Sequence, residues 1–268
     1  RRKKWFLILV AIELIIFTGL RAPSIGADTG VYVRYMTACR GISFKGIWNM
    51  KSNPFNFEIG YLIFSKLCSF CGLSDTQFLF VVAMIIYIPF LIFVYKECTA
   101  PLISILTYFA LNLFCYSLGI FRQMIALSVC IFSIPFIKEK KIGKACLIIV
   151  AASLFHTTAL CWLPICFIYL IDVTKYKNLV IPLGVIFTVA GRFFALIIIR
   201  FLPRYQHYVG SFRDVSGGSY LMLFFLIITY LLFKRKVDKV STISSIEKIS
   251  MAAISVAILA QAMSYSFG

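Results

Sequence analysis

Apolar runs separated by short basic segments recur along most of the chain, and this pattern constrains the fold more than any other feature. The runs are about 16 to 20 residues long, close to the roughly 20 that a helix needs to cross the hydrocarbon core of a bilayer. With 61% hydrophobic residues and a mean hydropathy of +0.94, the composition is typical of membrane proteins. The sequence therefore predicts an all-α, polytopic integral membrane helix bundle.

About nine crossings and one short helix are expected, in a single transmembrane domain over residues 1–268. Because the chain stops just after an apolar run, we expect further C-terminal spans beyond this sequence. The segment 58–71 has only 14 residues, too few to cross as a helix, and is expected to be re-entrant or interfacial. The expected crossings are 5–20, 77–95, 101–118, 120–137, 143–156, 158–172, 178–198, 219–234 and 246–265.

The distribution of basic residues sets the expected topology. If the segment 58–71 returns to its own side, twelve of the basic residues after position 75 face the cytoplasm and five face outward, as the positive-inside rule requires. The same rule favours a tight hairpin over one long helix across residues 143–172, which places His156 at an outer turn. The N-terminus is then cytoplasmic, and an outer loop over residues 21–57 lies on the opposite side.

The net charge of +17 would indicate a nucleic-acid partner in a soluble protein, but here the lysines lie between apolar runs. In that setting they mark topology or contact anionic membrane lipid, so no nucleic acid is expected as a partner. After position 75 all five outer cations are arginine, whereas eleven of the twelve inner ones are lysine. Because a guanidinium binds phosphate in bidentate fashion, this choice indicates a phosphate or pyrophosphate ligand on the outer face.

The polar, glycine-punctuated segment 21–61 is the expected extracytoplasmic substrate loop, together with the start of the dipping helix. Arg21 and Arg34 are candidates to clamp phosphates, and Asp28 is a candidate to orient or deprotonate a hydroxyl. The phenols of Tyr32 and Tyr61 are further candidates for substrate contact. The alternative is a solvated loop in which Asp28 and Arg34 form a structural ion pair.

Glu58 opens the apolar helix 58–71, near the level at which lipid chains begin. A carboxylate partly withdrawn from water has a raised pKa and can act as a general base at neutral pH. The alternative is an acid in the first turn that is favoured by the helix dipole.

Three further candidates lie at expected outer ends of spans. Arg122 at a helix start opposes the helix dipole and therefore calls for a partner, unless it extends to lipid phosphate. Gln123 beside it can donate and accept hydrogen bonds to a substrate. His156 is an isolated histidine in apolar surroundings, which is more often structural, but its outer position favours a role at a leaving phosphate or beside the catalytic carboxylate.

A second outer segment, residues 200–213, combines arginines with tyrosines. Arg204 and His207 are its candidates for substrate binding, and the tyrosines suit stacking on sugars. An ordinary interfacial aromatic belt is the alternative.

The nine cysteines give no sign of a disulfide framework, because the count is odd and most lie within apolar runs. Cys68-x-x-Cys71 is not followed by a second pair, and we interpret it as packing. No feature calls for a metal or a cofactor, since arginines can supply the positive charge of a divalent ion.

Four short motifs follow one another on the expected outer face: Leu20-Arg21 with Gly26-Ala-Asp28 and Tyr32, Glu58-Ile-Gly60-Tyr61, Arg122-Gln123-Met-Ile-Ala126, and Ser153-Leu-Phe-His156-Thr-Thr-Ala159. Together they resemble the EpsG family, the Wzy-like membrane polymerases of bacterial exopolysaccharide, capsule and O-antigen. The resemblance covers residues 20–160. It departs from the family pattern at Ile59, where a proline usually follows the glutamate.

The resemblance implies a glycosyltransferase of the bacterial cytoplasmic membrane, with its active face outside the cytoplasm. It implies transfer of a growing glycan from an undecaprenyl-pyrophosphate carrier to the non-reducing end of a lipid-linked repeat unit. The implied partners are this lipid-linked oligosaccharide and the chain-length regulator and flippase of the same pathway.

Residue roles follow from the same resemblance. Glu58 or Asp28 would deprotonate the acceptor hydroxyl, and His156 would assist at phosphate. The residues that would hold pyrophosphate are Arg21, Arg34, Arg122 and Arg204.

Three rival functions are weighed against this one. A transporter or flippase of lipid-linked oligosaccharide should show repeated halves and mid-bilayer polar residues, whereas polar residues here gather on one face. A membrane acyltransferase would usually present its histidine toward the cytoplasm. In a non-catalytic assembly partner of the polysaccharide machinery, the outer charged residues would only be part of the protein surface and would not act on a substrate.

Overall fold

The computed structural model describes residues 1–48, 55–188, 190, 217–240 and 242–264. Every regular element among these residues is a helix, which agrees with the all-α prediction. The chain divides into two compact units, Arg1–Leu163 and Pro164–Gly268. The single transmembrane domain therefore stays a prediction.

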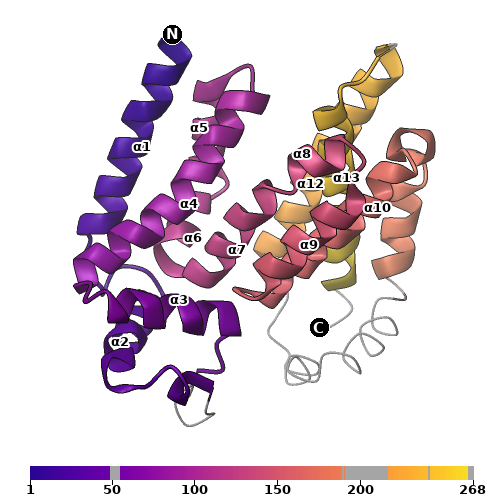
Figure 1. Ribbon diagram of the computed structural model, residues 1–268. Helices are drawn as coiled ribbons and strands as arrows, with labels where there is room; N and C mark the ends of the chain where they lie inside the picture. Colours follow the sequence, from indigo (N-terminus) through magenta and orange to yellow (C-terminus); the bar gives the residue numbers. More distant parts are fainter. Residues whose placement is uncertain (49–54, 189, 191–216, 241, 265–268) are drawn as a thin grey trace. The chain divides into compact units, whose positions relative to one another are not determined.

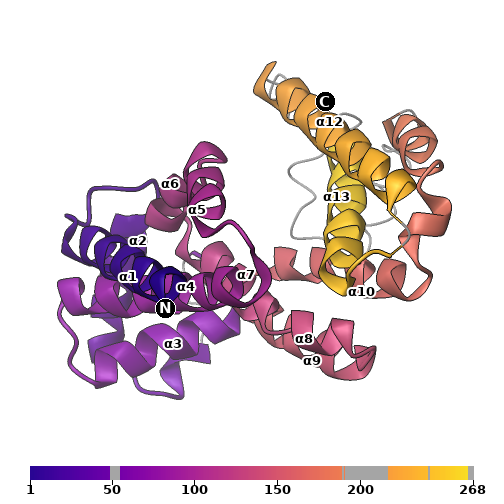
Figure 2. The same ribbon diagram turned by 90° about the horizontal axis from the view of Figure 1, so that it is seen from above.

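The frame of the first unit is an antiparallel pair of long helices, α1 (Arg2–Leu20) and α4 (Asp75–Glu97), which lie side by side in both views (Figure 1, Figure 2). The Lys3 ammonium donates to the Cys98 carbonyl at 2.5 Å near one end of the pair. Nearer the other end, the hydroxyls of Thr18 and Tyr87 are 2.9 Å apart. These contacts fix which end of α1 matches which end of α4.

The described residues between α1 and α4 form several helices, although the sequence predicts a loop over residues 21–57. It contains α2 (Thr29–Ala38), the short 3-10 turns η1 (Cys39–Gly41) and η2 (Gly46–Trp48), and then α3 (Ile59–Phe70). The helix α2 forms because Tyr32, Val33, Tyr35 and Met36 bury one face against the core, which outweighs its polar residues. Figure 1 shows α2 and α3 at the end of the unit where α1 finishes and α4 begins.

The helix α3 confirms that the segment 58–71 is short. Its 12 residues would extend only about 18 Å, less than the hydrocarbon core of a bilayer. The Lys66 ammonium is buried on this helix and donates to the Cys39 carbonyl of η1 at 2.9 Å.

The helical stretch Phe121–Lys138 matches the expected span 120–137 in length, but other helices in the rest of the first unit are shorter than the sequence predicts. The expected span 101–118 is broken at Leu111 and Asn112, where the two halves bend by 61° and Asn112 has a φ of 59°. The chain turns again before His156, and η4 contacts α9; the hairpin over residues 143–172 stays a prediction. The elements are α5 (Pro101–Ala110), α6 (Leu113–Gly119), α7 (Phe121–Ile131), α8 (Ile134–Lys138), α9 (Ile142–Ser153) and η4 (Thr157–Trp162).

Ion pairs join helix ends within the second unit, where α12 also packs against α13. It contains most of α10 (Leu163–Leu170), η5 (Val173–Tyr176), helical residues 180–188, α12 (Gly217–Lys239) and α13 (Ser245–Ser264). Lys248 pairs with Asp172 at 2.8 Å, and Lys177 pairs with Asp238 at 2.5 Å.

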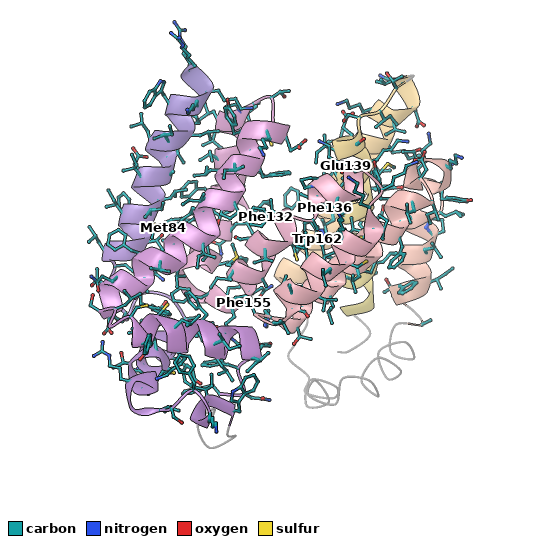
Figure 3. All side chains as sticks on the ribbon, viewed as in Figure 1. Met84, Phe132, Phe136, Glu139, Phe155 and Trp162 are labelled. Carbon is teal, nitrogen blue, oxygen red and sulfur yellow. The ribbon has the colours of Figure 1, made fainter. Side chains whose placement is uncertain are left out.

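Within the described part of the chain, three helical stretches are long and apolar enough to cross a membrane, namely Asp75–Glu97, Phe121–Lys138 and Ser245–Ala262, or four if the bent pair α5 and α6 counts as one span. The expected nine crossings are not confirmed, because several expected spans are short or broken helices and 178–198 extends beyond the described residues. Large apolar side chains such as Met84 and Phe132 remain exposed, as a lipid environment requires (Figure 3).

Candidate functional site

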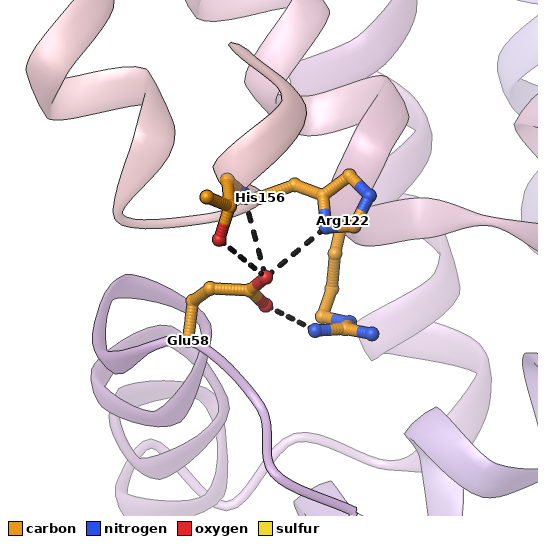
Figure 4. A network of polar contacts seen from close by, with 4 residues as sticks. Glu58, Arg122 and His156 are labelled. Carbon is orange, nitrogen blue, oxygen red and sulfur yellow. Dashed lines mark hydrogen bonds and ion pairs between the residues drawn. The ribbon is translucent and has the colours of Figure 1, made fainter. Parts of the chain in front are cut away.

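The carboxylate of Glu58 brings together three elements that are far apart in the sequence. Glu58 precedes α3, Arg122 begins α7, and His156 and Thr157 lie at the turn between α9 and η4 (Figure 4). Three of the four motifs that carry the family resemblance therefore meet at one carboxylate. All of these residues belong to the first unit.

Each oxygen of the Glu58 carboxylate has its own partners. Oε2 accepts from the Nη1 group of Arg122. Oε1 lies 3.2 Å from Nδ1 of His156 and accepts from Thr157 twice, from the backbone N–H at 3.4 Å and from the hydroxyl at 3.3 Å. The side chains of Glu58, Arg122 and His156 are only 7%, 16% and 20% exposed, so these contacts are largely withdrawn from water.

The backbone places Glu58 at this point. The Gly60 N–H donates to the Leu154 carbonyl at 2.7 Å, which joins the start of α3 to the end of α9. A Cβ at position 60 would lie 2.7 Å from that carbonyl oxygen, so only glycine permits the approach. The glycine two residues after Glu58 therefore has a packing role.

Aromatic rings surround the Arg122 guanidinium. Its Cζ lies 4.6 Å from the centre of the Phe57 ring and 5.9 Å from that of Tyr32. Tyr32 is buried and stacks on Phe121 at 5.1 Å, while Tyr61 packs on its edge. The rings hold the cation by cation–π attraction and restrict its motion.

The pKa of Glu58 moves in the direction opposite to the one the sequence predicts. Burial would raise it, but the hydrogen bond from His156 and the charge of Arg122 together lower the pKa from 4.5 to about 2. Glu58 is therefore ionised at neutral pH and is a weak base, so the prediction of a raised pKa was wrong.

The ionised carboxylate fixes the tautomer of His156. A carboxylate can only accept hydrogen bonds, so Nδ1 of His156 carries the proton that points at Oε1. In the neutral ring the lone pair then lies on Nε2. The arrangement can orient an imidazole whose Nε2 accepts a proton.

Arg21 has a different environment from the one expected for a pyrophosphate ligand. It is buried, and its guanidinium donates to the backbone carbonyls of Thr18 and, at 2.9 Å, of Leu118. It also lies 5.0 Å from the ring centre of Phe121. Burial lowers the pKa of Arg21 to about 10, so it stays charged at neutral pH. These contacts join Arg21 to the ends of α1 and α6, and the phosphate clamp stays a prediction.

The other predicted residues are dispersed. Asp28 and Arg34 are exposed at α2, and neither belongs to the network in Figure 4. Gln123 is exposed and lines a pocket of about 610 Å³. Arg204 and His207 lie outside the described residues.

The sequence did not predict the roles of three residues beside the cluster. Thr157 donates to Glu58, Phe57 packs on Arg122, and Gly60 allows α3 to approach Leu154. Each is adjacent or nearly adjacent to a residue that was singled out, and each lies in or beside a quoted motif. Their positions in or beside these motifs were the only sequence feature that could have indicated these roles. Among the described residues, no group of three His, Cys, Asp or Glu side chains could hold a metal ion.

Comparison with known proteins gives one match. The EpsG family matches residues 4–267, essentially the whole chain. No curated protein and no solved structure matches it.

Proposed function

The chain belongs to the EpsG family, and from this membership and the Glu58 cluster we propose that it is a polysaccharide polymerase. The family and the apolar helices place it among membrane proteins of polysaccharide assembly. We propose further that it joins undecaprenyl-pyrophosphate-linked repeat units at the outer face of the bacterial cytoplasmic membrane.

The observation that carries the proposal is the convergence of Glu58, Arg122 and His156 at one end of the first unit. The opposite end holds Lys3 beside Cys98 and the 2.9 Å ion pair of Lys138 with Glu97. A site for transfer from a pyrophosphate carrier needs a base for the acceptor and positive charge for the leaving group. The cluster offers both on the same side of the unit.

In the proposed reaction, Nε2 of His156 accepts the proton of the acceptor sugar hydroxyl. The hydroxyl oxygen bonds to the anomeric carbon of the donor glycan, and the bond from that carbon to the pyrophosphate oxygen breaks. The products are the lengthened glycan and a free polyprenyl diphosphate. The Arg122 guanidinium stabilises the negative charge that develops on this leaving group.

Glu58 takes the supporting part in this mechanism. With a pKa of about 2 it does not compete for the acceptor proton, but it holds the imidazole in the required tautomer and stabilises the imidazolium that forms. It also fixes Arg122, so one carboxylate orients both reacting groups. No step is assigned to Asp28.

The test is reconstitution in proteoliposomes with an undecaprenyl-pyrophosphate-linked repeat unit, with products separated as a ladder of multiple units. Wild-type protein should give the ladder. His156→Ala should slow its formation by about 10² to 10⁴-fold, the usual contribution of a general base. Glu97→Gln is the matched control, because it breaks the ion pair with Lys138 at the other end of the unit and should leave the ladder unchanged.

Two results would remove the proposal. One is the absence of any ladder from folded wild-type protein supplied with the repeat unit. The other is a His156→Ala protein that polymerises at the wild-type rate.

A further inference from the structure

A largely apolar pocket of about 610 Å³ lies within the first unit, beside the Glu58 cluster. Its walls come from the broken helix α6, from α7 and from η4. Its size is within the range of pockets that enclose small ligands. Representative lining residues are Leu113 and Tyr116 from α6, Leu127 and Cys130 from α7, and Cys161 and Trp162 from η4.

The pocket extends along one face of α7, starting next to the cluster. Gln123, Leu127 and Cys130 follow at spacings of four and three residues, so they share a face of the helix. Seven residues of helix correspond to about 10 Å of length. The polar lining residues Gln123 and Thr158 directly follow Arg122 and Thr157, whereas the lining farther along α7 is apolar.

This gradient fits an amphiphile with a polar head at the cluster and a hydrocarbon chain along α7. A glycan would leave its many hydroxyl groups without partners against such a lining. The volume of about 610 Å³ is large enough for a stretch of a polyprenyl chain.

We propose that this pocket binds the first isoprene units of the polyprenyl chain, those adjoining the diphosphate of the lipid-linked substrate. The inference rests on the proposed function, because it takes the diphosphate to lie at Arg122 and His156. It adds a site for the carrier that is separate from the groups that act on the sugar.

A native thiol offers a direct test. Cys161 lines the pocket and is exposed, whereas Cys71, at the end of α3, is exposed and is not among the lining residues. The full chain in phosphatidylcholine nanodiscs is treated with N-ethylmaleimide, with and without saturating undecaprenyl diphosphate that carries no sugar. Modification of each cysteine is followed by peptide mass spectrometry. We expect the carrier to slow modification of Cys161 at least about tenfold and to leave Cys71 unchanged.

Controls identify the occupant. Inorganic pyrophosphate and added phosphatidylglycerol should not protect Cys161. Equal protection by phosphatidylglycerol would overturn the proposal, because the pocket would then hold ordinary membrane lipid. Equal rates of Cys161 modification with and without undecaprenyl diphosphate would also overturn it, because the carrier would then not occupy the pocket.

A pair of substitutions separates this inference from the proposed function. Leu127→Trp fills the pocket and should raise the KM for the lipid-linked repeat unit about tenfold, whereas Leu147→Trp, on an exposed face of α9, should not. A ladder with an unchanged KM in Leu127→Trp refutes the pocket and leaves the polymerase intact. Protection of Cys161 without any ladder supports the pocket and refutes the polymerase.

Discussion

Glu58→Gln should destabilise the protein by an amount that depends on pH. A carboxyl group whose pKa falls from 4.5 to about 2 on folding contributes roughly 3 kcal/mol of stability at neutral pH. Because the folded-state pKa is lowered, this stability is present above about pH 4.5 and is lost as the pH falls toward 2. The substitution also leaves the largely buried Arg122 without its ionic partner, and breaking such a pair costs about 3 to 5 kcal/mol.

The assay is reversible unfolding in mixed detergent micelles between pH 7 and pH 3. Glu58→Gln should lower the free energy of unfolding by about 3 kcal/mol at pH 7, and the difference from wild type should shrink as the pH falls. The matched Glu97→Gln, whose pair with Lys138 is more exposed, should cost at most about 1 kcal/mol. A difference for Glu58→Gln that is below about 1 kcal/mol, or that does not change with pH, would refute the electrostatic reasoning.

Three further substitutions test how the site is positioned. Gly60→Ala would place a Cβ against the Leu154 carbonyl and should cost about 1 to 3 kcal/mol in thermal unfolding; wild-type stability would contradict that packing. Thr157→Val removes one donor to Glu58 and should cost about 1 kcal/mol, with recovery in Thr157→Ser; equal loss in both would show that the hydroxyl is not responsible. Arg21→Lys should lower unfolding stability by about 2 kcal/mol without weakening binding of carrier diphosphate, and the reverse result would restore Arg21 as a ligand.

The members of the site could be predicted from the sequence better than their roles. Glu58 and His156 stand out because the chain has only 10 acidic residues and two histidines, and Arg122 stands out because a cation at a helix start opposes the helix dipole. Apolar neighbours in the sequence indicate that Glu58 is buried, but they do not indicate which charged side chains lie beside it. The predicted direction of its pKa shift was therefore wrong. The direction depends on Arg122 and His156, which lie 64 and 98 positions away.

Arg21 illustrates a second limit. Arginine on an outer loop suggested phosphate, but helix ends also offer unpaired carbonyl oxygens that the sequence does not display. Its partners at Thr18 and Leu118 are backbone carbonyl oxygens, and the type of residue does not show that such an oxygen is available as a partner.

The helices were predictable in kind but not in length. Apolar runs cannot reveal the bend at Asn112, because its cause is local backbone geometry within a hydrophobic stretch. The helix α2 was missed since its glycine and charged residues masked a buried stripe of Tyr32, Val33, Tyr35 and Met36.

The distances along the chain between the partners of Glu58 set an order of events during biosynthesis. The ribosome makes the glutamate first, its arginine 64 residues later and its histidine 98 residues later. A nascent chain that ends before Arg122 contains Glu58 beside the hydrophobic helix α3 but lacks both Arg122 and His156. Translation of His156 and Thr157, after α9, is therefore the step that completes the cluster.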